Sequence, residues 1–175
     1  MKRHQGHVTR FAPTFVQLKG LMSVQATFPK VPLLLGLGGL VPFVVLSLAL
    51  ATGLSLPLFE DADSVRVALV GYGVAILSFL GGVRWGLAIT LNAKGDGKAD
   101  RDFVIAVIPA LVGWFAWFQP SPADLWWLAL AHILLGLLDY GLACRIVVPE
   151  WYGRLRLGLT AVAAASLILA AIVPG

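Results

Sequence analysis

The sequence predicts an all-α protein, an integral membrane bundle of five transmembrane helices, and two observations lead to this fold class. Hydrophobic residues make up 59% of the 175 residues and charged residues only 13%, whereas a soluble domain carries about 25% charged residues. The apolar residues also fall into five long segments, and a helix needs about 20 mostly apolar residues to cross a bilayer. Transmembrane β-strands would instead show alternating segments of about 10 residues, a pattern that this sequence lacks.

The first two helices are defined by long uncharged runs with an acidic connection between them. The first is expected over roughly residues 32–53, where Pro42 is tolerated if neighbouring helices satisfy the freed carbonyl group. The connection contains Glu60, Asp61 and Asp63. The second helix is expected over roughly 64–91 and is interrupted internally by one charge, Arg84.

The remaining three helices are separated by a charged loop, a proline-rich turn and a basic connection. The third is expected over roughly 102–119, after a charged, glycine-bearing loop that is typical of water-exposed segments. The fourth is expected over roughly 123–145 with one internal charge, Asp139, and the fifth over roughly 155–173.

The distribution of basic residues predicts the orientation of the bundle. Cytoplasmic loops carry an excess of Lys and Arg. With five crossings, eleven basic residues lie on the side of the N-terminus and only Arg66 lies on the other. The eleven are Lys2, Arg3, Arg10, Lys19, Lys30, Lys94, Lys98, Arg101, Arg145, Arg154 and Arg156. The N-terminus is therefore expected in the cytoplasm, in a bacterial inner (plasma) membrane.

Residues 1–30 form a basic N-terminal tail ahead of the transmembrane domain, which is expected over 31–175. The tail contains five Lys or Arg residues, two His and no acidic residue. Three interpretations remain open: a disordered juxtamembrane tail, an organelle transit peptide, or a start site annotated too early, with Met22 as the true start. A transit peptide would place the protein in the mitochondrial inner membrane instead.

The sequence motifs of soluble enzymes are absent. There is no phosphate-binding loop, no paired His for zinc and no GxSxG turn. We therefore expect no catalytic residue, no cofactor and no metal site. The net charge of +4 does not indicate nucleic acid either, because the basic residues flank the apolar segments.

Three polar residues inside the predicted helices form the candidate intramembrane site: Arg84, Asp139 and His132. Charges at the centre of a membrane helix are expensive, so they usually mark a pair or a pathway. Arg84 and Asp139 each lie about 10 Å from the inner end of their helices, at 1.5 Å per residue. Four interpretations remain open: a salt bridge, snorkelling of Arg84 to the inner interface, a proton or ion site that includes His132, and a contact with another subunit.

Small residues on one side of the second helix predict a packing face. At 100° per residue Gly71, Ala75, Ser78, Gly82 and Gly86 lie on the same side, and such a stripe lets another helix approach closely. We expect the second helix to lie at the centre of the bundle. A dimer interface on this stripe is the alternative.

Three stretches are distinctive: PLLLGLGGLVPF at 32–43, YGVAILSFLGGVRWG at 72–86 and PEWYGRLRLGLT at 149–160. Together with the five-helix plan, they resemble the transmembrane protein 69-like family, called domain of unknown function 3429, over about residues 30–173. The resemblance implies a multi-pass membrane fold. It implies no activity, cofactor or catalytic residue. It also implies that such chains begin shortly before the first helix, which favours Met22 as the start.

The sequence thus favours a non-enzymatic accessory or assembly protein of an energy-transducing membrane. The alternative is a small proton-linked transporter that uses Arg84, Asp139 and His132, with a membrane enzyme as a third interpretation. The expected partners are the lipid bilayer and either a membrane protein or a second copy of this chain, with no nucleic acid.

Overall fold

A computed structural model describes residues 29–93, 99–118, 123–144 and 148–173. This part of the chain contains five helices, each long and apolar enough to cross a membrane, which confirms the predicted fold class. The helices are α2 (Lys30–Thr52), α3 (Ala62–Ala93), α4 (Ala99–Phe118), α5 (Ala123–Cys144) and α6 (Glu150–Ile172). The basic tail before residue 29 and the three connections at 94–98, 119–122 and 145–147 lie outside the described residues, so the predictions for them stay predictions.

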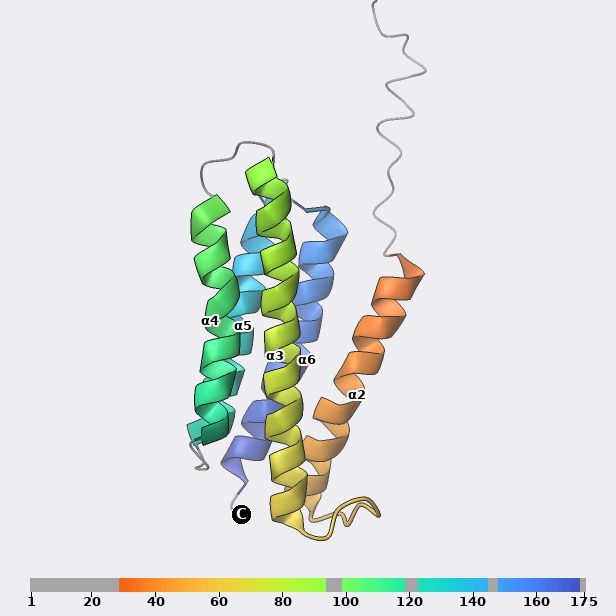
Figure 1. Cartoon of the computed structure of the whole chain (residues 1–175). Coiled ribbons are helices and arrows are strands. Elements are labelled where there is room, and N and C mark those ends of the chain that lie inside the picture. Colours follow the sequence, from red (N-terminus) through yellow and green to blue (C-terminus); the bar gives the residue numbers. More distant parts are fainter. Residues whose placement is uncertain (1–28, 94–98, 119–122, 145–147, 174–175) are drawn as a thin grey trace, which may run out of the picture.

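The helices run alternately up and down, so that α2 begins and α6 ends at opposite ends of the bundle (Figure 1). Helices α3, α4, α5 and α6 pack as a group, with α3 against α4 and α5 against α6 as the closest pairs. Helix α2 packs against α3 and α6 and leans away from the others toward its N-terminal end (Figure 1). The start of α2 and the end of α6 lie at opposite ends because the bundle has an odd number of crossings.

Local side-chain and backbone chemistry sets the connection between α2 and α3. Helix α2 ends at Gly53, whose φ of 69° is left-handed and whose N–H bonds the carbonyl oxygen of Ala49. Helix α3 begins after Asp61, whose Oδ1 accepts hydrogen bonds from the N–H of Ser64 at 2.8 Å and from its Oγ at 2.6 Å. Asp61 therefore caps the N-terminus of α3.

Two glycines allow the close helix pairs. A Cβ atom at Gly81 of α3 would lie 2.5 Å from the backbone oxygen of Ala106 in α4, and one at Gly136 of α5 would lie 2.5 Å from Oγ1 of Thr160 in α6. Such small residues let helix backbones approach each other in a membrane. Gly81 and Gly136 thus lie at positions of close approach within the two tight pairs, where a larger side chain would not fit without a shift.

The predicted packing stripe on α3 is wrong as a contact within this chain. Gly82 and Gly86 have nothing within 4 Å of an added Cβ and are exposed, Ala75 is exposed, and Ser78 is only partly buried. Among the three glycines of the stripe, only Gly71 has a neighbour in another helix, with Trp117 at 3.1 Å from an added Cβ. The buried face of α3 carries large and small residues together with Arg84, and its members include Leu69, Gly73, Leu77, Leu80, Gly81, Arg84 and Ala88.

The predicted central position of α3 is confirmed in part. Helix α3 packs against α2, α4 and α5, but a larger share of α5 is buried. The fully buried leucines of the core come from α3, α5 and α6, and include Leu69, Leu77, Leu125, Leu128 and Leu167. The outer surface carries many exposed leucine, valine and aromatic side chains, as expected for helices that face lipid.

Candidate functional site

Four charged side chains from four helices form a continuous ion-paired row inside the bundle. In order of contact they are Asp102 of α4, Arg84 of α3, Asp139 of α5 and Arg156 of α6. We call these four residues the buried charge chain. All four are buried, and their two positive and two negative formal charges sum to zero.

Asp139 lies in the middle of the buried charge chain and uses both carboxylate oxygens. Its Oδ1 accepts a hydrogen bond from Nη1 of Arg84 at 3.1 Å, and its Oδ2 accepts one from Nε of Arg156 at 3.0 Å. Charge-assisted hydrogen bonds of this kind are roughly twice as strong as neutral ones. The contact predicted between Arg84 and Asp139 is therefore confirmed.

Arg84 bridges two carboxylates with the two arms of its guanidinium group. Nη1 bonds Asp139, and Nη2 donates to Oδ1 of Asp102 at 2.8 Å. The side chain of Arg84 is only 4% exposed, so it does not reach the inner interface by snorkelling. A planar fork of donors suits this double contact, which a lysine could not reproduce.

Sequence reasoning missed Asp102 and Arg156 because helices α4 and α6 begin earlier than the hydropathy segments. The hydropathy pattern begins at about 102 and 155, whereas α4 begins at Ala99 and α6 at Glu150. Both residues therefore lie further inside their helices than the hydropathy pattern predicts, in the first or second turn rather than at the very start. If the expected helices had been extended by one turn at their N-terminal ends, Asp102 and Arg156 would have been recognised as charges inside a helix.

All four residues lie toward the same end of the bundle. Helices α3 and α5 finish at the end where α4 and α6 begin (Figure 1). The matched depth that was predicted for Arg84 and Asp139 thus also applies to their two additional partners.

His132 of α5 is buried but does not join the buried charge chain. Its Nδ1 lies 2.8 Å from the carbonyl oxygen of Leu128, one turn earlier in the same helix. Because a carbonyl only accepts, Nδ1 carries the proton. The ring also packs edge-on against Phe43 of α2, with centroids 5.7 Å apart. The structure therefore brings together two of the three predicted site residues, and leaves His132 outside the ion pairs of the buried charge chain.

A further ion pair joins α3 and α5 at the opposite end of the bundle. Arg66, near the start of α3, donates to Oδ1 of Asp124, near the start of α5. The same carboxylate oxygen accepts a hydrogen bond from the N–H of Leu125. The described helices are thus tied by ion pairs toward both ends, and only toward the end of the buried charge chain are more than two helices involved.

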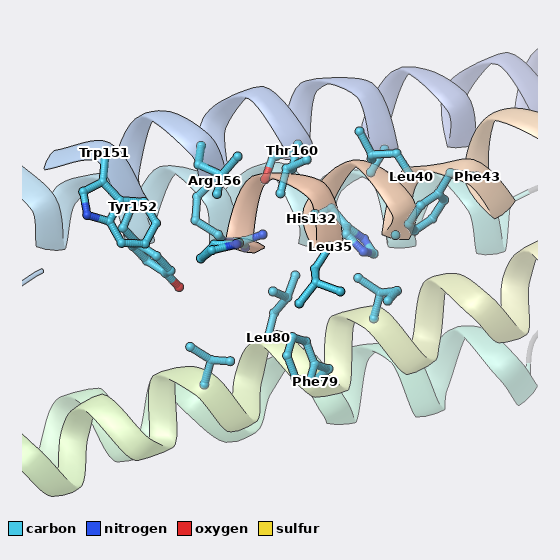
Figure 2. A pocket seen from close by; sticks show the side chains of 18 residues that line it. Leu35, Leu40, Phe43, Phe79, Leu80, His132, Trp151, Tyr152, Arg156 and Thr160 are labelled. Carbon is cyan, nitrogen blue, oxygen red and sulfur yellow. The ribbon is translucent and has the colours of Figure 1, made fainter. Parts of the chain in front are cut away.

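A cleft of about 520 Å³ opens between α2, α3 and α6 (Figure 2). Its walls are mostly apolar, and the polar side chains that reach it include Arg156, Tyr152, Thr160 and His132. We call it the α2 cleft. Within the described residues, no group of three His, Cys, Asp or Glu side chains is arranged to hold a metal ion.

A protein-family model and a curated relative both match this chain. A family model described as "Protein of unknown function (DUF3429)" matches residues 28–172. The sequence is 40% identical over 146 residues to transmembrane protein 69 of Xenopus tropicalis, and the match covers 80% of this chain and 53% of that protein. The chain therefore spans about half the length of this curated relative. No solved structure matches the chain.

Proposed function

This chain belongs to the DUF3429 family of proteins of unknown function, and we propose that it is a non-enzymatic accessory or assembly protein of an energy-transducing membrane. Its five helices make it a multi-pass membrane protein. We place it in the bacterial inner membrane, with the mitochondrial inner membrane as the alternative. The excess of basic residues beside the N-terminus supports a cytoplasmic or matrix position for that end.

One observation carries the proposal: both oxygens of Asp139 are bonded to arginines, and these contacts join four helices. A transport pathway needs a buried group that can exchange its proton or ligand during the cycle. Among the described residues the most buried carboxylate, that of Asp139, is instead held between two guanidinium groups. These bonds favour a rigid helix bundle. A rigid bundle would act by binding other molecules on its outer surface.

The competing proposal is a small proton-linked transporter that uses Arg84, Asp139 and His132. His132 would have to exchange protons with Asp139, yet its Nδ1 hydrogen bond goes to Leu128 within its own helix. A feature in favour is the Nε2 atom of His132, which is buried without a hydrogen-bond partner in the described structure. His132 lines the mostly apolar α2 cleft, and its described hydrogen bond goes to Leu128 and not to Asp139, so we rank transport second.

Copurification tests the accessory role. The full chain, expressed at native level with a small C-terminal tag, is solubilised in a mild detergent and the complex is sized and identified by mass spectrometry. We expect a membrane-protein partner in fixed stoichiometry. A monomer that carries no partner under conditions that preserve a known complex of the same membrane would contradict the role.

A proteoliposome assay addresses the competing role directly. Wild-type protein and Asp139→Asn are reconstituted at equal density with a pH-sensitive dye inside the vesicles. We expect no proton flux above that of protein-free vesicles in either sample. A flux that is present in wild type and lost in a correctly folded Asp139→Asn variant would replace our proposal with transport.

A further inference from the structure

We propose that the α2 cleft binds an uncharged membrane amphiphile whose head carries carbonyl or hydroxyl oxygens, with its apolar chain lying between α2 and α3. The prenylated quinols and the diacylglycerols share this chemistry, because each carries a hydroxyl group beside an apolar chain. The inference does not depend on the accessory role, because it concerns a site that the buried charge chain does not fill.

The shape of the cleft fits a ligand that enters from the bilayer. Its volume of about 520 Å³ lies within the range of small-molecule pockets, roughly 300–1,000 Å³. Helix α2 meets α3 where the hydroxyl of Tyr72 donates to the carbonyl oxygen of Gly39 at 2.7 Å. Toward its N-terminal end α2 leans away from the bundle (Figure 1). Leu35 and Phe79 line this part of the cleft, yet they are 72% and 65% exposed. The cleft is therefore open on a side that faces lipid.

Two buried polar atoms in the lining have no hydrogen-bond partner in the part of the chain that the structure describes. They are Nη2 of Arg156 and Nε2 of His132. Their residues are only 7% and 2% exposed, and both line the cleft, where Figure 2 shows them beside the aromatic and leucine side chains. Buried polar groups without a partner are rare and costly, so a ligand that pairs with them gains affinity.

The two atoms need hydrogen-bonding partners of different kinds, one an acceptor and the other a donor. Nη2 of Arg156 is a donor and needs an acceptor oxygen. Because Nδ1 of His132 donates to Leu128, Nε2 of the neutral ring carries no proton and accepts a hydrogen bond. An oxygen of either kind can accept a hydrogen bond from the arginine, but only a hydroxyl group can donate one to the histidine. The head therefore needs at least one hydroxyl group.

The charge balance favours an uncharged head. The guanidinium of Arg156 is already paired with Asp139, and the buried charge chain to which it belongs is neutral as a whole. A phosphate or carboxylate placed beside it would add a negative charge without a free counterion in a setting of low dielectric. Trp151 and Tyr152 also line the cleft near Arg156 and offer aromatic surface to a flat head (Figure 2).

Native mass spectrometry of the full chain in detergent micelles tests the site with three probes. They are decylubiquinol, dioctanoylglycerol and dioctanoyl phosphatidic acid. We expect decylubiquinol or dioctanoylglycerol to bind as one molecule per chain, and whichever of the two binds more tightly identifies the source of the ligand. A preference for phosphatidic acid over both neutral probes would overturn the proposal.

Matched variants distinguish binding of the probe in the α2 cleft from its unspecific partition into the micelle. Leu35→Trp places a large ring in the open cleft and should abolish the one-to-one adduct. Leu34→Trp is the control, because Leu34 is similarly exposed on the same helix but does not line the cleft. Equal adducts in both variants would show unspecific uptake and contradict the site.

A third variant tests the polar contact without filling the cleft. His132→Asn keeps a donor near the position of Nδ1 and removes Nε2, so we expect affinity to fall about tenfold, as for one lost hydrogen bond. Circular dichroism and the melting temperature verify that each variant is folded. An unchanged affinity in folded His132→Asn would remove the histidine from the site and contradict the proposed pairing.

Discussion

The two arginines of the buried charge chain bond different numbers of carboxylates, so they should contribute differently to the stability of the fold. Arg84 bonds two carboxylates, Asp102 and Asp139, whereas Arg156 bonds one. Removing one member of a buried pair leaves an uncompensated charge, which costs roughly 3–5 kcal/mol. The number of carboxylates left without a cation should therefore set the order of the effects.

We expect Arg84→Leu to destabilise the fold by about 3–5 kcal/mol and Arg156→Leu by less. Loss of Arg84 leaves Asp102 without its cation, whereas after loss of Arg156 Asp139 still has Arg84. The measurement is the free energy of unfolding in mixed detergent micelles. Arg154→Leu is the control, since its pair with Glu150 is exposed and such pairs contribute at most about 1 kcal/mol. Equal effects of the Arg84 and Arg154 variants would contradict a structural role of the chain.

Only part of this residue-level site could be predicted from the sequence. Arg84 and Asp139 stood out because each interrupts an otherwise apolar segment, and equal depth suggested their pairing. Asp102 and Arg156 resembled ordinary interfacial charges, because hydropathy places the start of a helix where the apolar run begins. Whether His132 joins them depends on which way its ring turns, and helical periodicity does not determine that.

At the scale of the helices, the close pairs depend on which glycine faces the neighbour. Gly81 and Gly82 are adjacent in α3, but an added Cβ at Gly81 would lie 2.5 Å from the oxygen of Ala106, whereas one at Gly82 would meet nothing within 4 Å. The sequence predicted the correct type of contact on the wrong face of α3, since a count of small residues ignores which large residues are drawn into the core. The presence, order and approximate bounds of the helices were predictable, because each needs only its own length of apolar sequence.

We expect Gly81→Ala to destabilise the protein and Gly82→Ala to leave its stability unchanged or slightly raised. The added methyl at position 81 forces α3 and α4 apart, while at position 82 it only improves helix propensity, by up to about 1 kcal/mol. Unfolding in mixed micelles measures both variants. A larger loss at position 82 than at position 81 would show that the exposed stripe packs against another molecule.

At the scale of the whole molecule, the buried charge chain joins four helices, and the fifth helix, α2, leans away from them toward its N-terminal end (Figure 1). The buried charge chain joins α3, α4, α5 and α6, and none of its members comes from α2. Helix α2 is held instead by apolar contacts and by the hydrogen bond from Tyr72 to Gly39. The α2 cleft lies beside the helix that the ion pairs of the buried charge chain do not reach.

The five crossings predict that the two connections at opposite ends of the bundle react with reagents from opposite sides of the membrane. Leu58→Cys lies between α2 and α3 and is highly exposed, and Glu150→Cys lies at the start of α6. Each is made in a Cys144→Ser background, which removes the natural thiol of the chain. In intact cells or organelles an impermeant maleimide should label Leu58→Cys and spare Glu150→Cys. Labelling of both from one side would contradict the topology.

The most direct test of the central claim, that the buried charges hold the helices together, is a double-mutant cycle on Arg84 and Asp139. Arg84→Leu, Asp139→Leu and the double variant are unfolded in mixed micelles beside the wild type. We expect the double variant to be more stable than the sum of the single effects predicts, with a coupling free energy of about 1–3 kcal/mol. Strictly additive effects would show that the two side chains are energetically independent, and the structural role assigned to the buried charge chain would be wrong.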